Sequence, residues 1–451
     1  MSDLPSLAEA VAARAEPGEL VEVYVARGQD TEVRAFEGDV ESLSSATSSG
    51  VGIRVLVEKD GGGRLGFAWA GSLDEDVVAE TLAEARDNAA YATFDPDVTF
   101  ARPDGVAPAD LDLWDADLAS VPTDRKVTMA IDLERQVRHA DSRIRQVSSA
   151  DYGDELVEVA LASSTGIRAF TRRTAAFLSV SAIAGEGADS QTGTGFSAGR
   201  GLGDLDPDRA ADDSVTRAVR MLGATKAPSG RSTVVFDPRV VSTLLSVMSA
   251  AMSGEAVVKG RSFFAGRLGE QVAAPEVTLV DDPTDPRAFA AATFDAEGLA
   301  TRRNVLVAHG MLGQFLYDTV SARRAGTRST ASAVRGGFAG TPGVGCRALV
   351  LEPGQLDQPG ILAAVGEGLY VQSITGVHSG VSVVSGDFSV GAEGLLIRGG
   401  HLAQPVREIT VASTLQRMLQ SIQFIGADLE WLPGVAAGQT LAVGDMQISG
   451  S

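Results

Sequence analysis

The fold of this chain is decided by the stretch Gly376-Val-His-Ser-Gly-Val-Ser-Val-Val-Ser-Gly-Asp-Phe-Ser-Val-Gly391, which continues as Ala392-Glu-Gly-Leu-Leu-Ile-Arg-Gly-Gly-His401. Apolar residues alternate there with small polar ones, and glycines interrupt the run. Such a pattern is typical of packed strands joined by tight turns, and it argues against a helix. The alternation continues in Pro405-Val-Arg-Glu-Ile-Thr-Val-Ala412. We therefore expect this part of the chain to consist mainly of β-strands.

The rest of the C-terminal half has the same character, with short apolar runs between glycines. Predicted strands cover residues 232–236, 277–280, 303–307, 348–351 and 368–374, with a closing strand at 428–432. Helical spacing of apolar residues predicts helices over about 238–252 and 413–422.

The N-terminal half shows one plan twice, strands followed by a helix. The first copy has a helix over 5–16, strands over 21–26, 31–36, 49–57 and 64–70, and a helix over 74–91 that Ser72 is expected to cap. After an irregular connector over 95–123, the second copy has a helix over 124–141, strands over 143–149, 156–162, 167–171 and 176–183, and a helix from 206 to about 222. The recurrence predicts two related halves.

A proline- and glycine-containing segment at residues 226–230 marks the predicted domain boundary. The predicted fold class is α+β: an N-terminal α/β domain of two related strand–helix halves over residues 1–225, and a mainly β domain over residues 231–451.

Composition restricts the partners and the compartment. The chain has 451 residues, 44% of them hydrophobic, and a net charge of −21. This acidic surface argues against nucleic acid and anionic membranes as partners. Cys346 is the single cysteine, so no internal disulfide can form; we expect it to be a small buried side chain in a protein of the reducing cytoplasm. No N-terminal signal peptide and no membrane-spanning apolar run are expected.

Metal chemistry finds no support in the spacing of the histidines. The four are His139, His309, His378 and His401, and no two lie within five residues of each other. Zinc hydrolases usually place two histidines on one helix face, with a glutamate beside them as the base. We therefore expect each histidine to have a surface or hydrogen-bonding role.

Other catalytic arrangements are not expected either. On a strand, the neighbours His378 and Ser379 would point to opposite faces and could not pair. The glycine-rich residues 185–203 are predicted to be a flexible loop rather than a dinucleotide site. Two acidic pairs, at 281–282 and 212–213, are interpreted as solvated turns or helix starts. We assign no catalytic, cofactor-binding or metal-binding residue.

Several short motifs, in the right order, resemble the TldD/PmbA metallopeptidase family over most of the chain. They lie at residues 40–45, 50–55, 66–70, 164–166, 172–181, 259–272, 294–298, 304–307, 309–313 and 317–323, and in the C-terminal stretch quoted above.

The resemblance implies a metal site in one branch of the family and its loss here. TldD-type members carry His-Glu-x-x-x-His on the helix before the Gly-Arg-Ser-Phe-like segment, and a cysteine near the C-terminus as third ligand. Counting back from Gly260, Leu245, Ser246 and Ala250 stand where the two histidines and the glutamate belong. No cysteine follows Cys346. The chain is thus similar to the PmbA (TldE) branch.

This resemblance implies a non-catalytic subunit that pairs with a TldD-like catalytic subunit in a cytosolic heterodimeric metallopeptidase, acting in proteolysis and peptide maturation. The partner would hold zinc or iron and this chain no cofactor; the substrate would be a peptide or unfolded protein. Two alternatives stay open: a stand-alone hydrolase with a relocated site at His378, His401 or an acidic pair, and a homodimeric peptide-binding scaffold.

Overall fold

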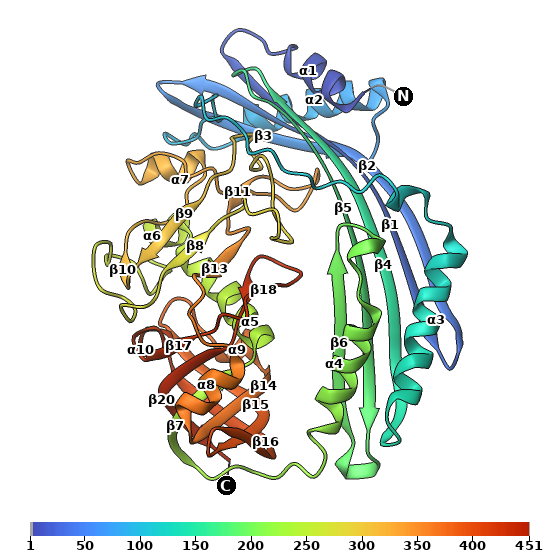
Figure 1. Ribbon diagram of the computed structural model, residues 1–451. Coiled ribbons are helices and arrows are strands. Elements are labelled where there is room, and N and C mark those ends of the chain that lie inside the picture. Colours follow the sequence, from blue (N-terminus) through green and yellow to red (C-terminus); the bar gives the residue numbers. More distant parts are fainter. Residues whose placement is uncertain (1–2, 451) are drawn as a thin grey trace.

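Six long antiparallel strands form the N-terminal half in the computed structural model, which describes residues 3–450. Residues 1–2 and 451, at the outer ends of the two predicted domains, lie outside this range. The sheet order is β3-β2-β1-β4-β5-β6, and the four inner strands run most of the length of the molecule (Figure 1). Their bounds are β1 Glu19–Phe36, β2 Asp39–Lys59, β3 Gly62–Ala70, β4 Ile144–Ser163, β5 Arg168–Ala184 and β6 Gln191–Gly199.

The central strands are longer than predicted. Residues 21–26 and 31–36 belong to one strand, β1, and β4 and β5 likewise each join two predicted strands. The apolar alternation lapses at Gly28, yet the backbone there pairs with Ser48 on one side and Val157 on the other. Because two neighbouring strands satisfy its hydrogen-bonding groups, the strand continues where side-chain pattern alone predicts a break.

Both halves of this sheet follow one plan, as predicted, but the plan is helix, three strands and helix, whereas the sequence predicted four shorter strands in each half. The helices are α1 Leu4–Ala12, α2 Glu75–Tyr91, α3 Thr123–Ala140 and α4 Pro207–Val219. They cover one face of the sheet, α1 and α2 at one end and α3 and α4 at the other (Figure 1). Asp74, and not Ser72, is the N-cap residue of α2; the Ser72 hydroxyl accepts a hydrogen bond from the Asp74 amide.

The glycine-rich residues 185–203 correct the prediction of a flexible loop, because residues 191–199 form edge strand β6. Helix α4 packs directly on this strand, where glycine is required. A Cβ atom at Gly193 would lie 2.1 Å from the Ser214 carbonyl oxygen, and one at Gly195 would lie 1.8 Å from that of Ala210. The glycines therefore serve close helix–strand packing and not mobility.

Replacing Gly195 with alanine should lower the free energy of unfolding by about 1–3 kcal/mol, because α4 must move off the sheet to admit the methyl group. Gly203→Ala is the matched control, since a Cβ atom there meets nothing within 4 Å. Urea denaturation of both variants tests this, and equal stabilities would contradict the packing role of Gly195.

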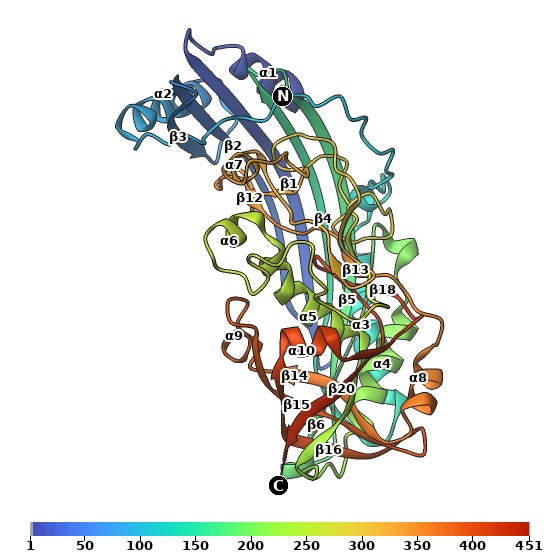
Figure 2. The same ribbon diagram turned by 90° about the vertical axis from the view of Figure 1, so that its left-hand side faces the viewer.

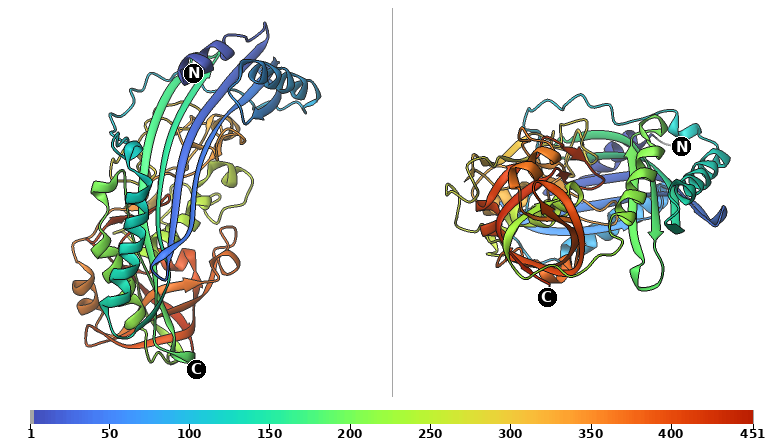
Figure 3. Two further views of the ribbon diagram at one scale, coloured as in Figure 1. Left: turned by 90° about the vertical axis from the view of Figure 1, so that its right-hand side faces the viewer. Right: turned by 60° about the horizontal axis from the view of Figure 1, so that its bottom comes forward.

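The C-terminal half is built on a closed sheet. Strands β16-β15-β14-β7-β20 are paired in that order, and β20 pairs again with β16, so the ring closes (Figure 3). The strands of the ring are β7 Gly230–Phe236, β14 Gly368–Thr375, β15 Asp387–Arg398, β16 His401–Thr414 and β20 Leu441–Ser449; β17 Ile422–Ile425 pairs with β20. A second sheet has the order β10 Met311–Leu312, β9 Asn304–Ala308, β8 Leu279–Asp281 and β13 Leu349–Leu351. Two short ladders of two residues each complete the half: β11 Ala333–Val334 pairs with β12 Gly343–Val344, and β18 Glu430–Trp431 pairs with β19 Ala437–Gly438.

Two details of this half differ from the sequence predictions. The predicted closing strand at residues 428–432 is wrong, since only residues 430–431 form a strand there, β18. The strand that closes the sheet is β20, which was not predicted. The stretch that opens at Gly376 begins with a helical turn, α9 Val377–Gly380, before its two strands. The other helices are α5 Pro238–Ser249, α6 Gly254–Val258, α7 Thr319–Arg324, α8 Gln358–Val365 and α10 Leu415–Gln420.

The two halves meet across the helix-free face of the N-terminal sheet. In β1, Val21, Val23 and Val25 face the helices, whereas the alternate residues Glu22 and Tyr24 face the C-terminal half. The C-terminal half lies in front of the long strands in Figure 2. Among residues 3–450, no helix is both long enough and apolar enough to cross a membrane.

Candidate functional site

Helix α5 contains the positions at which the catalytic branch was expected to carry metal ligands. Leu245 is 4% exposed and packs in the largest hydrophobic core. Ser246 is half-buried and Ala250 exposed at the end of the helix. An apolar side chain in a dry core offers no electron pair to a metal ion. The residues present on α5 therefore do not fit a zinc or iron site.

The four histidines lie on separate elements and are all exposed. His139 is in the last turn of α3, His309 in the turn between β9 and β10, His378 in α9, and His401 at the start of β16. His378 and Ser379 share a helical turn, not the strand that the sequence predicted. Within the described range, no three His, Cys, Asp or Glu side chains are arranged to hold a metal ion.

The remaining candidate groups are engaged in the fold. Asp281 is buried in β8 and accepts hydrogen bonds from two backbone amides, so the predicted solvated turn is wrong there. Asp213 lies within α4 and pairs with Arg217 and Arg239 rather than opening a helix. Cys346 is buried, as expected, and burial raises the pKa of its thiol.

A Gly-x-Ser-x-Gly run at residues 195–199 was not among the predicted sites. In hydrolases such a serine occupies a sharp turn between a strand and a helix. Here Ser197 lies inside the edge strand β6, is 8% exposed, and accepts a hydrogen bond from the Asp206 amide at 2.9 Å. The pattern is therefore structural.

A cavity of about 520 Å³ lies between the two halves of the molecule, and we call it the inter-domain cavity. Its floor is the helix-free face of β1, β4 and β5, and the C-terminal half supplies the opposite wall. Residues that line it include Tyr24, Arg27, Glu155, Val157, Val159, Thr171, Arg173, Phe294, Asp295, Arg335, Phe338 and Arg347. It combines apolar strand surface with four arginines, a composition that suits a polar ligand of extended shape.

A buried ionic group supports one end of this cavity. Glu22 binds the guanidinium of Arg54 at 2.5 and 2.8 Å and that of Arg335, from the other half, at 2.6 Å. Arg335 also stacks on Tyr24, with 4.6 Å between its guanidinium carbon and the ring centre. Burial alone would raise the pKa of Glu22, but the two arginines outweigh it and hold that pKa below 4.5.

Two buried carboxyls belong to the same region, Asp295 in the lining of the cavity and Glu297 two residues further along the chain. Glu297 is 1% exposed and accepts two hydrogen bonds from Thr319, from the amide at 2.9 Å and from the hydroxyl at 2.6 Å. Burial, followed by the negative charge of Asp295, raises the pKa of Glu297 above its ordinary value of 4.5. Burial also raises the pKa of Asp295. The folded chain therefore retains a proton here that an unfolded chain would release.

Replacing Glu297 with glutamine should weaken the pH dependence of stability. Because the folded-state pKa of Glu297 is the higher one, unfolding releases its proton, and its contribution to stability is lost as the pH rises from the ordinary carboxyl range through the raised value. Glutamine cannot ionise, so the free energy of unfolding of E297Q should increase relative to that of the parent chain as the pH rises. Urea denaturation at several pH values from mildly acidic to mildly alkaline measures this. Parallel profiles would contradict it.

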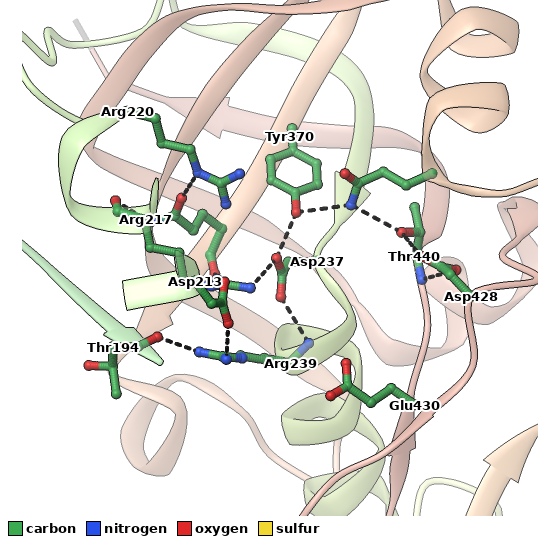
Figure 4. Close-up of polar contacts among 12 residues, drawn as sticks. Thr194, Asp213, Arg217, Arg220, Asp237, Arg239, Tyr370, Asp428, Glu430 and Thr440 are labelled. Carbon is green, nitrogen blue, oxygen red and sulfur yellow. Dashed lines mark hydrogen bonds and ion pairs between the residues drawn. The ribbon is translucent and has the colours of Figure 1, made fainter. Parts of the chain in front are cut away.

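A second cavity, of about 710 Å³, lies where α4 meets the start of α5. Figure 4 shows that its charged side chains point toward one another. Asp237 caps α5 by accepting from the Arg239 amide at 2.9 Å, and it also accepts from the Tyr370 hydroxyl at 2.6 Å and from Arg217 at 2.7 Å. Arg239 pairs in turn with Asp213. Since these charged groups are paired with one another, we interpret the network as an ionic contact that holds α4 of the N-terminal half against α5 of the C-terminal half, and not as a ligand site.

Three models of one family match the chain in succession. They are PmbA/TldA metallopeptidase domain 1 at residues 21–89, the central domain at 116–222 and the C-terminal domain at 229–450. The architecture and these matches define a metallopeptidase-family protein. The chain belongs to the PmbA/TldD family.

Individual relatives agree with this assignment. Metalloprotease PmbA of Escherichia coli O157:H7 is 29% identical, over 95% of this chain and 92% of the relative. A metalloprotease TldD homologue of Haemophilus influenzae is 26% identical over 94% and 89%. The crystal structure of TldE from Thermococcus kodakarensis superposes with a TM-score of 0.87 at 23% identity, covering 96% of this chain and 97% of that one, and so shows the same fold.

Proposed function

We propose that this chain is the non-catalytic, TldE/PmbA-like subunit of a heterodimeric cytoplasmic metallopeptidase that acts in proteolysis and peptide maturation. In this proposal a TldD-like subunit supplies the metal ion, zinc or iron, and the catalytic base. This chain supplies architecture and part of the surface that holds the peptide or unfolded substrate.

The observation that carries the proposal is the environment of Leu245. The side chain belongs to a core that includes Val241, Leu244, Met248 and Met418. A histidine there would exchange apolar packing for a buried polar group that needs a partner. The packing around Leu245 therefore leaves no room for a metal-binding side chain at this position. This favours a subunit that relies on another chain for its metal chemistry.

The inter-domain cavity supports the peptide-holding part of the proposal. It lies on the surface of long strands, and extended peptides are bound in many proteins through their main chain, with pockets that select individual side chains. Its lining offers apolar surface at Val157, Val159 and Phe338 beside charged groups. Such a site would accept many sequences.

The test is reconstitution. The chain is purified alone and together with a TldD-type subunit that carries His-Glu-x-x-x-His, and peptide cleavage and metal content are measured for each sample. We expect cleavage and metal only with the second subunit, and a stable complex of the two on gel filtration.

Two results would overturn the proposal. Metal-dependent cleavage by the isolated chain, with a stoichiometric bound metal, would establish a stand-alone enzyme. Recovery of only a homodimer from the native cell would instead establish a scaffold without a peptidase partner.

A further inference from the structure

Two arginines of the inter-domain cavity have buried donors without an acceptor. Nε and Nη1 of Arg335, and Nε of Arg347, make no hydrogen bond within the described part of the chain, although each atom is buried. The Arg335 side chain is 1% exposed. A buried charged donor that lacks an acceptor costs free energy, so native structures rarely retain one without a reason.

The positive charge of Arg347 has fewer partners than that of Arg335. Its side chain donates one long hydrogen bond, from Nη2 to the Ala333 carbonyl oxygen at 3.3 Å, and no carboxylate of residues 3–450 lies within ion-pair distance of it. The nearby carboxyls, Asp281 and Asp295, are engaged by backbone amides. Burial lowers the pKa of Arg347, yet a guanidinium stays charged at any physiological pH.

The other cavity supplies a comparison within the same molecule. There Arg209, Arg217 and Arg239 each have a carboxylate partner, and Arg220 donates to the side-chain oxygen of Gln372. Most arginines that line this second cavity are thus paired with carboxylates of the same chain. The inter-domain cavity departs from that pattern at Arg347, and at Arg335 the carboxylate of Glu22 accepts from Nη2 but leaves Nε and Nη1 without an acceptor.

We propose that the inter-domain cavity is a carboxylate-binding site, in which Arg347 and Arg335 together hold one carboxylate group of an extended peptide. A planar guanidinium can present two parallel N–H groups to a carboxylate, the pairing that gives the strongest hydrogen bonds of this kind. Apolar surface at Val157, Val159 and Phe294 would contact the rest of the peptide. This deepens the proposed function, on which its choice of a peptide rests.

The carboxylate has two sources in a peptide, the C-terminus and an acidic side chain. Three versions of one short alanine–serine peptide separate them: one with a free C-terminus, one amidated with an internal glutamate, and one amidated with glutamine at that position. Binding to the purified chain alone is measured by calorimetry. We expect either or both of the first two to bind about tenfold to a hundredfold more tightly than the third.

Arg347→Gln should remove that preference and bring all three peptides to the affinity of the glutamine version. Arg398→Gln is the matched control, because Arg398 is 59% exposed, pairs with Glu367 at 2.6 Å, and does not line the cavity. Arg347→Lys should recover part of the preference through charge alone. Since Arg347 makes one long hydrogen bond, the melting temperature of R347Q should stay close to that of the parent chain.

Equal binding of the three peptides, or an unchanged preference in R347Q, would overturn the carboxylate site. A large loss of thermal stability in R347Q would overturn it too, by assigning Arg347 a structural role. All of these measurements use this chain without a catalytic partner. A failed reconstitution with a TldD-type subunit would therefore refute the proposed function and leave the carboxylate test standing.

Discussion

Replacing Glu22 with alanine should lower the free energy of unfolding by about 3–5 kcal/mol. Glu22 is the shared anion of Arg54 and Arg335, and its removal leaves two guanidinium groups buried without their carboxylate. The cost is therefore that of two uncompensated charges and not of one lost contact. Because Arg335 comes from the other half of the chain, the two halves should also separate more easily, and proteolysis at residues 223–229 should become faster.

The matched control is Glu158→Ala on β4. Glu158 also faces an arginine, Arg27, but at 3.8 Å and with both side chains about one-third exposed. Solvent screens such a pair, so its loss should cost less than about 1 kcal/mol. Urea denaturation compares the two variants, and a similar small loss in both would refute the role assigned to Glu22. The lowered pKa of Glu22 adds a further check: its contribution should disappear as the pH falls through that value.

Replacing Asp237 with alanine should be comparably damaging, at about 3–5 kcal/mol. Asp237 is 2% exposed and meets three donors: the amide that opens α5, the Arg217 guanidinium and the Tyr370 hydroxyl. Alanine would leave the amide and the Tyr370 hydroxyl without their acceptor, and Arg217 with Asp213 as its one remaining carboxylate among the described residues. The start of α5 and its packing against α4 should loosen together.

Two further variants calibrate the Asp237 result. Tyr370→Phe removes one donor and keeps the ring, so it should cost only about 1 kcal/mol. Arg231→Ala breaks an exposed pair with Asp445 and should cost almost nothing. Combining Asp237→Ala with Tyr370→Phe should cost less than the sum of the two, since the hydroxyl no longer needs an acceptor. Strict additivity would show that the two side chains do not share the network.

Local patterns in the sequence predicted the fold class, the repeated plan of the N-terminal half and most helices. They failed where the deciding contact is distant along the chain. Residues 191–199 read as a glycine-rich loop because the helix that needs those glycines, α4, begins at residue 207. Breaks were predicted within β1, β4 and β5, since alternation of side chains does not reveal pairing on both edges.

The candidate site was less accessible to sequence reasoning than the fold. The family resemblance identified Leu245, Ser246 and Ala250 as the positions to inspect, and the structure then revealed the core around Leu245. Nothing in the sequence near Arg335 or Arg347 signals a cavity, because its floor is contributed by strands more than a hundred residues away. Whether an arginine has an acceptor depends on three-dimensional neighbours, which spacing alone cannot supply.

The alternation of β1 makes the length of this strand as important as its composition. Odd-numbered residues such as Val25 and Val33 pack beneath the helices, while Glu22 and Tyr24 face the other half of the chain. Deleting one residue between Arg27 and Asp30 would invert the facing of everything on one side of the gap. Such a register shift would bury carboxylates under α1 or turn valines toward the arginines. We therefore expect this segment to tolerate substitutions far better than insertions or deletions.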